Sequence, residues 1–153
     1  MQLPKLQKVS SKPKKKKILL LSDDLRMHSG VGTMSREIVF GTIDKYDWVQ
    51  LGGAIKHPDA GKIVDMNQAV REDTGVEDAS LKIYPIDGYG SQELVRELLA
   101  IEKPDAILHY TDPRFWIWLY QMEHEIRQSI PIFYYNIWDN LHYPRWNEPY
   151  YEI

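Results

Sequence analysis

The chain contains no cysteine among its 153 residues, which excludes disulfides, thiolate metal sites and cysteine nucleophiles. This absence fits a reducing compartment, and we expect a cytoplasmic protein. No apolar run approaches the roughly 18 residues that a membrane span needs, and no apolar signal segment stands at the N-terminus. The composition, 43% hydrophobic and 27% charged, is typical of a globular domain.

Positive charge is scarce outside the first 17 residues. The rest of the chain carries twelve bases against twenty-two acids, and such an acidic body argues against nucleic acid as a partner. We expect residues 1–17 to form a disordered basic tail and residues 18–153 to form one domain. A nuclear-import patch or a polyanion contact is the alternative to a solvated lead-in. The seven lysines of the tail are Lys5, Lys8, Lys12, Lys14, Lys15, Lys16 and Lys17.

Short apolar runs alternate with helical patterns along the body. The run Ile18–Leu21 is typical of a strand buried on both faces, and apolar residues at 31, 34, 38 and 39 share one face of a predicted helix. The order predicts an α/β fold, a doubly wound parallel sheet whose ligands bind beyond the carboxyl ends of the strands. Further strands are predicted near residues 48–51, 81–86, 106–110 and 130–135, and further helices near 67–72, 91–99 and 112–126.

The loop after the first strand ends in Gly30-Val31-Gly32, directly before a helix. Glycines there let backbone amides approach a phosphate, and Ser29 and Thr33 add hydroxyl groups. A dinucleotide fingerprint is not complete, because Ser35 stands at the third glycine position and Gly52-Gly53 replace the acid after the second strand. The sequence leaves two interpretations: an anion site, or a tight turn that packs the helix on the sheet.

Asp23 and Asp24 follow the first strand and have two interpretations. Paired carboxylates hold Mg²⁺ in phosphoacceptor receiver domains, where Asp87 would be the phosphoacceptor. A receiver also needs a lysine after the fifth strand, and none stands there. Polar turn residues are therefore the favoured interpretation, and no metal site is expected.

His109 lies near the end of the fourth predicted strand, and Asp112 stands three residues later, before Pro113. A histidine at that place suits a general base or a partner for a sugar hydroxyl, and a buried structural histidine is the alternative. Asp112 followed by proline is typical of a helix N-cap.

Aromatic residues crowd the end of the chain, where residues 110–151 hold 13 of the 18. After the last strand, Trp138, Asp139 and Asn140 place an aromatic ring beside polar side chains. Such a set suits stacking on sugar rings with hydrogen bonds to hydroxyls. The same aromatics suit a core or an interface for a partner, and the sequence does not separate the two.

Three stretches resemble the N-terminal half of GT-B glycosyltransferases, above all the retaining group that includes glycogen synthases. They are KKKILLLSDDLRMHSGVGTMSREIV, KPDAILHYTD and PIFYYNIWDN. The resemblance implies a Rossmann-like, acceptor-side domain at a cleft between two domains. It implies transfer of a sugar from a nucleoside diphosphate sugar to a hydroxyl acceptor, with no other cofactor.

The resemblance also implies roles for single residues. The donor diphosphate would meet Ser29, Gly30, Val31 and Gly32; the catalytic residues would be His109 and Asp139; the acceptor would meet Tyr110, Trp138 and Asn140. The family often has a histidine after the fifth strand, and this chain has Trp138-Asp139 there instead.

The second domain of that family has no counterpart in this sequence. We therefore expect an incomplete enzyme that is inactive alone and needs a C-terminal domain or a partner chain. Two alternatives remain: a non-catalytic α/β module that docks through its aromatic C-terminal stretch, and a receiver-like phosphoacceptor domain.

Overall fold

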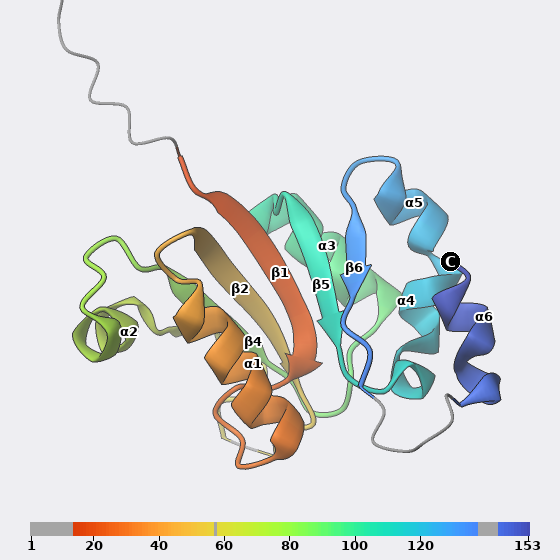
Figure 1. Ribbon diagram of the computed structural model, residues 1–153, viewed down its shortest axis with the longest axis horizontal. Helices are drawn as coiled ribbons and strands as arrows, with labels where there is room; N and C mark the ends of the chain where they lie inside the picture. Colours follow the sequence, from red (N-terminus) through yellow and green to blue (C-terminus); the bar gives the residue numbers. More distant parts are fainter. Residues whose placement is uncertain (1–13, 57, 138–143) are drawn as a thin grey trace, which may run out of the picture.

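The computed structural model describes residues 14–56, 58–137 and 144–153 and shows an α/β domain built on a six-stranded sheet (Figure 1). The strand order is β3-β4-β2-β1-β5-β6, parallel except for β3. The predicted doubly wound α/β fold is confirmed. In chain order the elements are β1 (Lys16–Asp23), α1 (Gly30–Gly41), β2 (Tyr46–Gly53), β3 (Val64–Asp65), α2 (Asn67–Thr74), β4 (Leu81–Pro85), α3 (Gln92–Glu102), β5 (Ala106–Tyr110), the 3-10 helix η1 (Pro113–Trp116), α4 (Ile117–Gln121), α5 (Glu123–Arg127), β6 (Ile132–Tyr134), the 3-10 helix η2 (Arg145–Asn147) and α6 (Glu148–Tyr151).

Helices cover both faces of the sheet, and each face has its own core. On one face α1 and α2 pack through Val39 and Val70 against Leu20 of β1. On the other face α3, η1, α4 and α5 pack against Leu19 and Leu21 of the same strand. All three leucines of β1 are fully buried, which explains the continuous apolar run in the sequence.

The chain changes direction within the sheet between β1 and β5. It runs from β1 outward through β2 to β4, then returns along α3 to pair β5 with the free side of β1. In open parallel sheets the loops diverge at such a switch point and leave a crevice at the carboxyl ends of the strands. The loops after β1 and after β5, which hold candidate site residues, lie on either side of this switch point.

Several element boundaries differ from the predictions. β1 begins at Lys16, so two lysines of the predicted tail are strand residues. The single helix predicted near residues 112–126 is three short pieces, η1, α4 and α5. Residues 145–151, for which the sequence predicted no element, form η2 and α6. The two-residue strand β3 was not predicted either, because a strand of that length has no periodicity.

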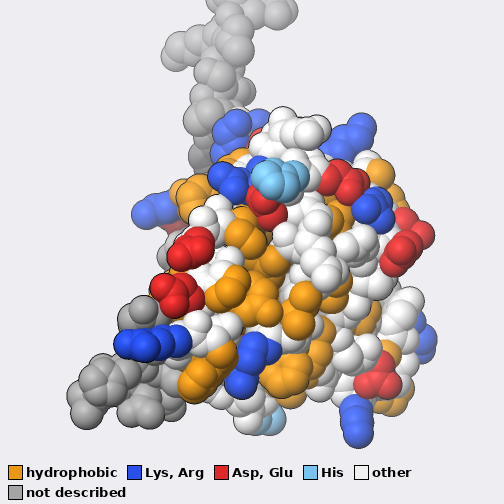
Figure 2. Space-filling model, turned by 90° about the vertical axis from the view of Figure 1, so that its right-hand side faces the viewer, with side chains coloured by type: hydrophobic (Ala, Val, Ile, Leu, Met, Phe, Trp, Pro, Cys, Tyr) orange, Lys and Arg blue, Asp and Glu red, His pale blue; other side chains and the backbone are white. Residues whose placement is uncertain are grey.

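On the α1 face, no helix in the described part of the chain lies over β5 and β6 (Figure 1). Phe133 of β6 is 57% exposed and Tyr135, just after it, is 47% exposed. Figure 2 shows hydrophobic side chains gathered in a band on the side of the molecule that carries β6 and the C-terminal helices. The exposed large hydrophobic residues of the last strand and the C-terminal segment are Phe133, Tyr135, Ile137, Trp146 and Ile153.

Candidate functional site

The candidate site lies at the carboxyl edge of the sheet, around the switch point between β1 and β5. A buried polar network holds the loop after β1 in place. Gln50 of β2 donates from Nε2 to Ser22 Oγ at 2.8 Å and to the Asp23 carbonyl at 2.8 Å, while its Oε1 accepts from the Leu25 amide at 3.1 Å. Ser35 of α1 donates to Ser22 Oγ at 3.1 Å. The loop is therefore bound to both β2 and α1.

Asp24 is fully buried, and its carboxylate is held by Arg26 through Nε at 3.0 Å and Nη2 at 2.9 Å. The other end of the guanidinium, Nη1, lies 3.3 Å from Asp59. A Cβ on Gly52 would stand 2.8 Å from Asp24 Oδ2. The lack of a side chain at Gly52 therefore leaves room for the Asp24 carboxylate. The sequence predicts no such role for Gly52, because the contact joins residues far apart in the chain.

The two glycines in the first turn of α1 have different surroundings. A Cβ on Gly32 would stand 2.7 Å from the Met27 carbonyl, so this glycine serves the tight turn of its own loop. Around Gly30 nothing lies within 4 Å of a Cβ, and its Cα faces open space. The sequence left an anion site and a tight turn as alternatives; the contacts assign Gly32 to the turn.

Ser29 caps α1, with Oγ accepting from the Gly32 amide at 3.0 Å, and the Ser29 carbonyl accepts from the Thr33 amide at 2.8 Å. Within the described part of the chain no hydrogen bond engages the amides of Gly30 and Val31. An anion at this terminus would therefore meet those two amides and the positive end of the helix dipole.

Asp23, the last residue of β1, lies on the opposite face of the strand from Ser22 and is half-buried. Its Oδ1 is buried and has no hydrogen-bond partner among the described residues, and burial raises the pKa of the carboxyl above its ordinary 3.8. Asp23 and Asp24 therefore do not act as a pair, because Arg26 occupies the second one. No cluster of three or more metal-binding side chains is found among the described residues.

An aromatic pair lies beside Asp23. Tyr89, in the loop after β4, lies with Cδ1 3.2 Å from the position that a Cβ on Gly53 would take. Gly53 pairs with Asp23 across the sheet. The Tyr89 ring stacks on Phe115 with centroids 5.0 Å apart and planes 16° apart, and Phe115 is 53% exposed. Burial raises the pKa of the Tyr89 hydroxyl, and the charge of Asp23 adds to this effect. The sequence gave no sign of this pair, whose members lie on two separate loops.

Asp112 caps η1, as predicted, with Oδ1 accepting from the Arg114 amide at 3.0 Å. The Arg114 side chain folds back on the same carboxylate, with Nε 3.0 Å from both oxygens. Hydrogen bonds from Arg114 lower the pKa of the Asp112 carboxyl. The charge of Asp112 is thus balanced at the rim of the crevice, next to Phe115.

His109 is fully buried, facing away from α1, among the rings of Trp116, Tyr120 and Tyr134. Its Nδ1 lies 2.7 Å from the Tyr120 hydroxyl, and Nε2 has no partner among the described residues. Burial lowers the pKa of the imidazole from 6.5 to about 3. These facts match the structural histidine that the sequence left as an alternative; the side chain does not reach solvent in this conformation.

The remaining predicted acceptor and catalytic residues divide into two groups. Tyr110 is 4% exposed and packs edge-on against Tyr135 at 4.9 Å, so most of its ring belongs to the core. Trp138, Asp139 and Asn140 lie outside the described residues, and their predicted roles stay predictions.

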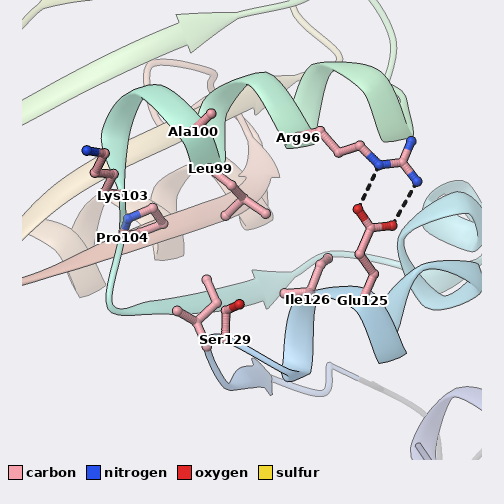
Figure 3. A pocket seen from close by; sticks show the side chains of 9 residues that line it. Arg96, Leu99, Ala100, Lys103, Pro104, Glu125, Ile126 and Ser129 are labelled. Atoms are coloured by element: carbon pink, nitrogen blue, oxygen red, sulfur yellow. Dashed lines mark hydrogen bonds and ion pairs between the residues drawn. The ribbon is translucent and has the colours of Figure 1, made fainter.

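A hollow lies far from this site, between α3 and α5 near the amino ends of the strands (Figure 3). It has a volume of about 540 Å³, an apolar floor that includes Leu99 and Ile126, and the Arg96–Glu125 ion pair at one end. No predicted site residue lines it.

The chain matches no protein-family model, no curated protein and no solved structure. Among the described residues, none of the helices has the length and apolar character to traverse a bilayer.

Proposed function

We propose that this chain is the acceptor-side domain of a glycosyltransferase that moves a sugar from a nucleoside diphosphate sugar to a hydroxyl. One observation supports it most: the free amides at the start of α1 lie beside the switch point, on the same edge of the sheet as Asp23 and Tyr89. An anion-binding helix terminus and a polar, aromatic surface thus lie at the same edge of the sheet.

In this proposal the amides of Gly30 and Val31 stabilise negative charge on the leaving diphosphate. Such preorganised donors stabilise the charge that develops on the phosphate oxygens as the bond between the anomeric carbon and the diphosphate breaks. The Ser29 hydroxyl, which accepts from the Gly32 amide, keeps its own proton for a phosphate oxygen. His109 supports the end of β5 from the core.

The described residues supply one wall of such a site. A second domain or a partner chain would supply the other wall and the remaining contacts to the donor, so we expect little or no transfer by this chain alone. Binding of the diphosphate is the part of the reaction that this chain can be tested for.

The test is a calorimetric titration of the chain with UDP and with GDP. Gly30→Asp places a carboxylate where the phosphate would bind, and an acid at a helix N-terminus does not destabilise the helix. We expect this variant to bind the nucleotides about tenfold more weakly. Gly41→Asp is the matched control, because nothing lies within 4 Å of its Cβ either and it adds the same charge at the other end of α1.

Equal affinity of the Gly30→Asp and Gly41→Asp variants would show that nucleotides do not bind at this terminus. Failure of the unaltered chain to bind either nucleotide would overturn the proposed donor contact.

A non-catalytic interaction module is the second candidate. The exposed Phe133 of β6 and the exposed Tyr135 just after this strand favour it. Light scattering distinguishes the two: a module that docks through this face should associate in a way that Phe133→Ser abolishes. The receiver alternative is disfavoured, because Arg26 occupies Asp24 and leaves no paired carboxylates for Mg²⁺.

A further inference from the structure

Tyr89 and Phe115 form a ring platform at the carboxyl edge of the sheet. The two rings are nearly parallel, and the outer one, Phe115, offers more than half of its surface to solvent. Trp116 supports Tyr89 from below, edge-on at 5.8 Å, and is itself fully buried. The platform is therefore anchored in the core while its outer ring stays bare.

The position of the platform is set by a glycine. The Tyr89 ring lies where a side chain on Gly53 would stand, 3.2 Å from the Cβ position, and the Gly88 carbonyl lies 3.0 Å from it. The Gly88 carbonyl also accepts from the Ala54 amide at 2.7 Å. Because Gly53 pairs with Asp23 across the sheet, this contact brings the ring next to the Asp23 carboxyl.

Among the carboxylates at this edge, Asp23 has a buried oxygen, Oδ1, that finds no partner within the described residues. Arg26 occupies Asp24, and Arg114 occupies Asp112, but no ion pair or hydrogen bond within the described residues reaches Asp23 Oδ1. A buried acceptor without a donor is costly, and a ligand that brings a hydroxyl or an amide would remove the cost.

We propose that Tyr89, Phe115 and Asp23 form a saccharide-binding site, in which a pyranose lies on the Phe115 ring and a hydroxyl donates to Asp23. A pyranose has both features at once, an apolar face of C–H groups and a ring of hydroxyl donors. The inference rests on the proposed function, for which it names the acceptor as a carbohydrate and the platform as its subsite.

A cation is the competing ligand, because aromatic rings beside a carboxylate also suit an ammonium group. The Arg114 guanidinium on η1 is neutralised by Asp112, so it adds no net positive charge beside Phe115. Choline is therefore included in the test as the competing ligand.

Ligand-observed saturation-transfer NMR on the full chain tests this, with the methyl glycosides of glucose, galactose, mannose and N-acetylglucosamine as probes. We expect at least one to bind, and its dissociation constant to rise about fivefold in Phe115→Ala and in Asp23→Asn. Phe133→Ala is the matched control, because it also removes a half-exposed phenyl ring, from the other face of the sheet, and should leave binding unchanged.

Three outcomes would overturn the inference: no transfer to any of the four glycosides, equal losses in Phe115→Ala and Phe133→Ala, or binding of choline in place of the sugars. The nucleotide titration separates this inference from the proposed function. Nucleotide binding without sugar binding would overturn only the saccharide site. Sugar binding without nucleotide binding would overturn the transferase proposal and leave a carbohydrate-binding domain.

Discussion

Arg26 donates to both carboxylate oxygens of Asp24, from Nε to Oδ1 at 3.0 Å and from Nη2 to Oδ2 at 2.9 Å. The Asp24 amide donates to the Gly53 carbonyl at 3.1 Å. This pair fixes the loop between β1 and α1 against the end of β2, and it removes Asp24 from any chemistry in the crevice. A buried charge held in this way has little freedom to move.

Gly52→Ala is expected to destabilise the protein by about 2 kcal/mol, because the new methyl would overlap the fixed Asp24 carboxylate. Gly30→Ala is the control, since its methyl would point into open space. Urea denaturation followed by circular dichroism measures both. Similar free energies of unfolding for the two variants would contradict the close contact.

Gln50→Leu is expected to lower the free energy of unfolding by about 3 kcal/mol. The substitution removes the Gln50 amide from the buried network and leaves the Leu25 amide without its acceptor, while the Asp23 carbonyl keeps only its hydrogen bond from Ser22 Oγ. Gln68→Leu makes the same change on exposed α2, where the side chain reaches only Glu72, and should have almost no effect. A loss as large at position 68 would argue against the network.

His109 should give the protein a dependence on pH that begins below about 6.5. The unfolded chain binds a proton near that value, while the folded chain binds it only near pH 3, because burial lowers the pKa of the imidazole. The stability that neutral His109 contributes is thus complete above pH 6.5. It is lost on acidification, at about 1.4 kcal/mol per pH unit. Denaturation at pH 7, 6 and 5 measures the slope.

The comparison for that slope is His109→Phe, which keeps a ring among Trp116 and Tyr120 and has no proton to bind. Its stability should change less between pH 7 and pH 5 than that of the unaltered chain. A histidine resonance of His109 that titrates near pH 6.5 in the folded protein would show that the side chain is not buried.

Glu102→Gln is expected to cost about 2 kcal/mol at neutral pH. The carboxylate is nearly fully buried and accepts from Lys17 at 3.3 Å, from Lys82 at 3.0 Å and from the Tyr84 hydroxyl. Burial alone would raise its pKa, but these hydrogen bonds outweigh it and hold the pKa below 4.5. The contribution is therefore complete above pH 4.5 and is lost at lower pH.

Glu125→Gln offers the contrast, since the Arg96–Glu125 pair is about half exposed on each side and solvent screens it. Thermal unfolding at pH 7 should leave this variant unchanged while Glu102→Gln melts earlier. If both melt alike, the Glu102 cluster contributes no more than a surface pair.

Local sequence patterns were sufficient to predict the fold class. The triple leucine of β1 and the Asp112-Pro113 helix start each depend on a few neighbouring residues, and the structure confirms them. The α/β order followed from these elements. Boundaries were less accurate: the sequence does not show that β1 extends back to Lys16, because its first residues lie at the edge of the core.

The site depends on contacts between distant residues, which a single sequence does not display. Gly52 and Gly53 were noted only as the place of a missing acid, yet one makes room for Asp24 and the other for Tyr89. His109 was correctly placed at the end of a strand, but its depth depends on rings from η1, α4 and β6. The direction of a side chain at a strand end is a property of the packed layers, not of the strand.

The Glu102 carboxylate ties together β1, β4 and the end of α3 near the amino ends of the strands. These elements are thereby clamped into one rigid block on the side remote from the crevice. Hydrogen exchange should therefore be slow across the clamped block, whereas the amides of Gly30 and Val31, which no hydrogen bond engages among the described residues, should exchange fast.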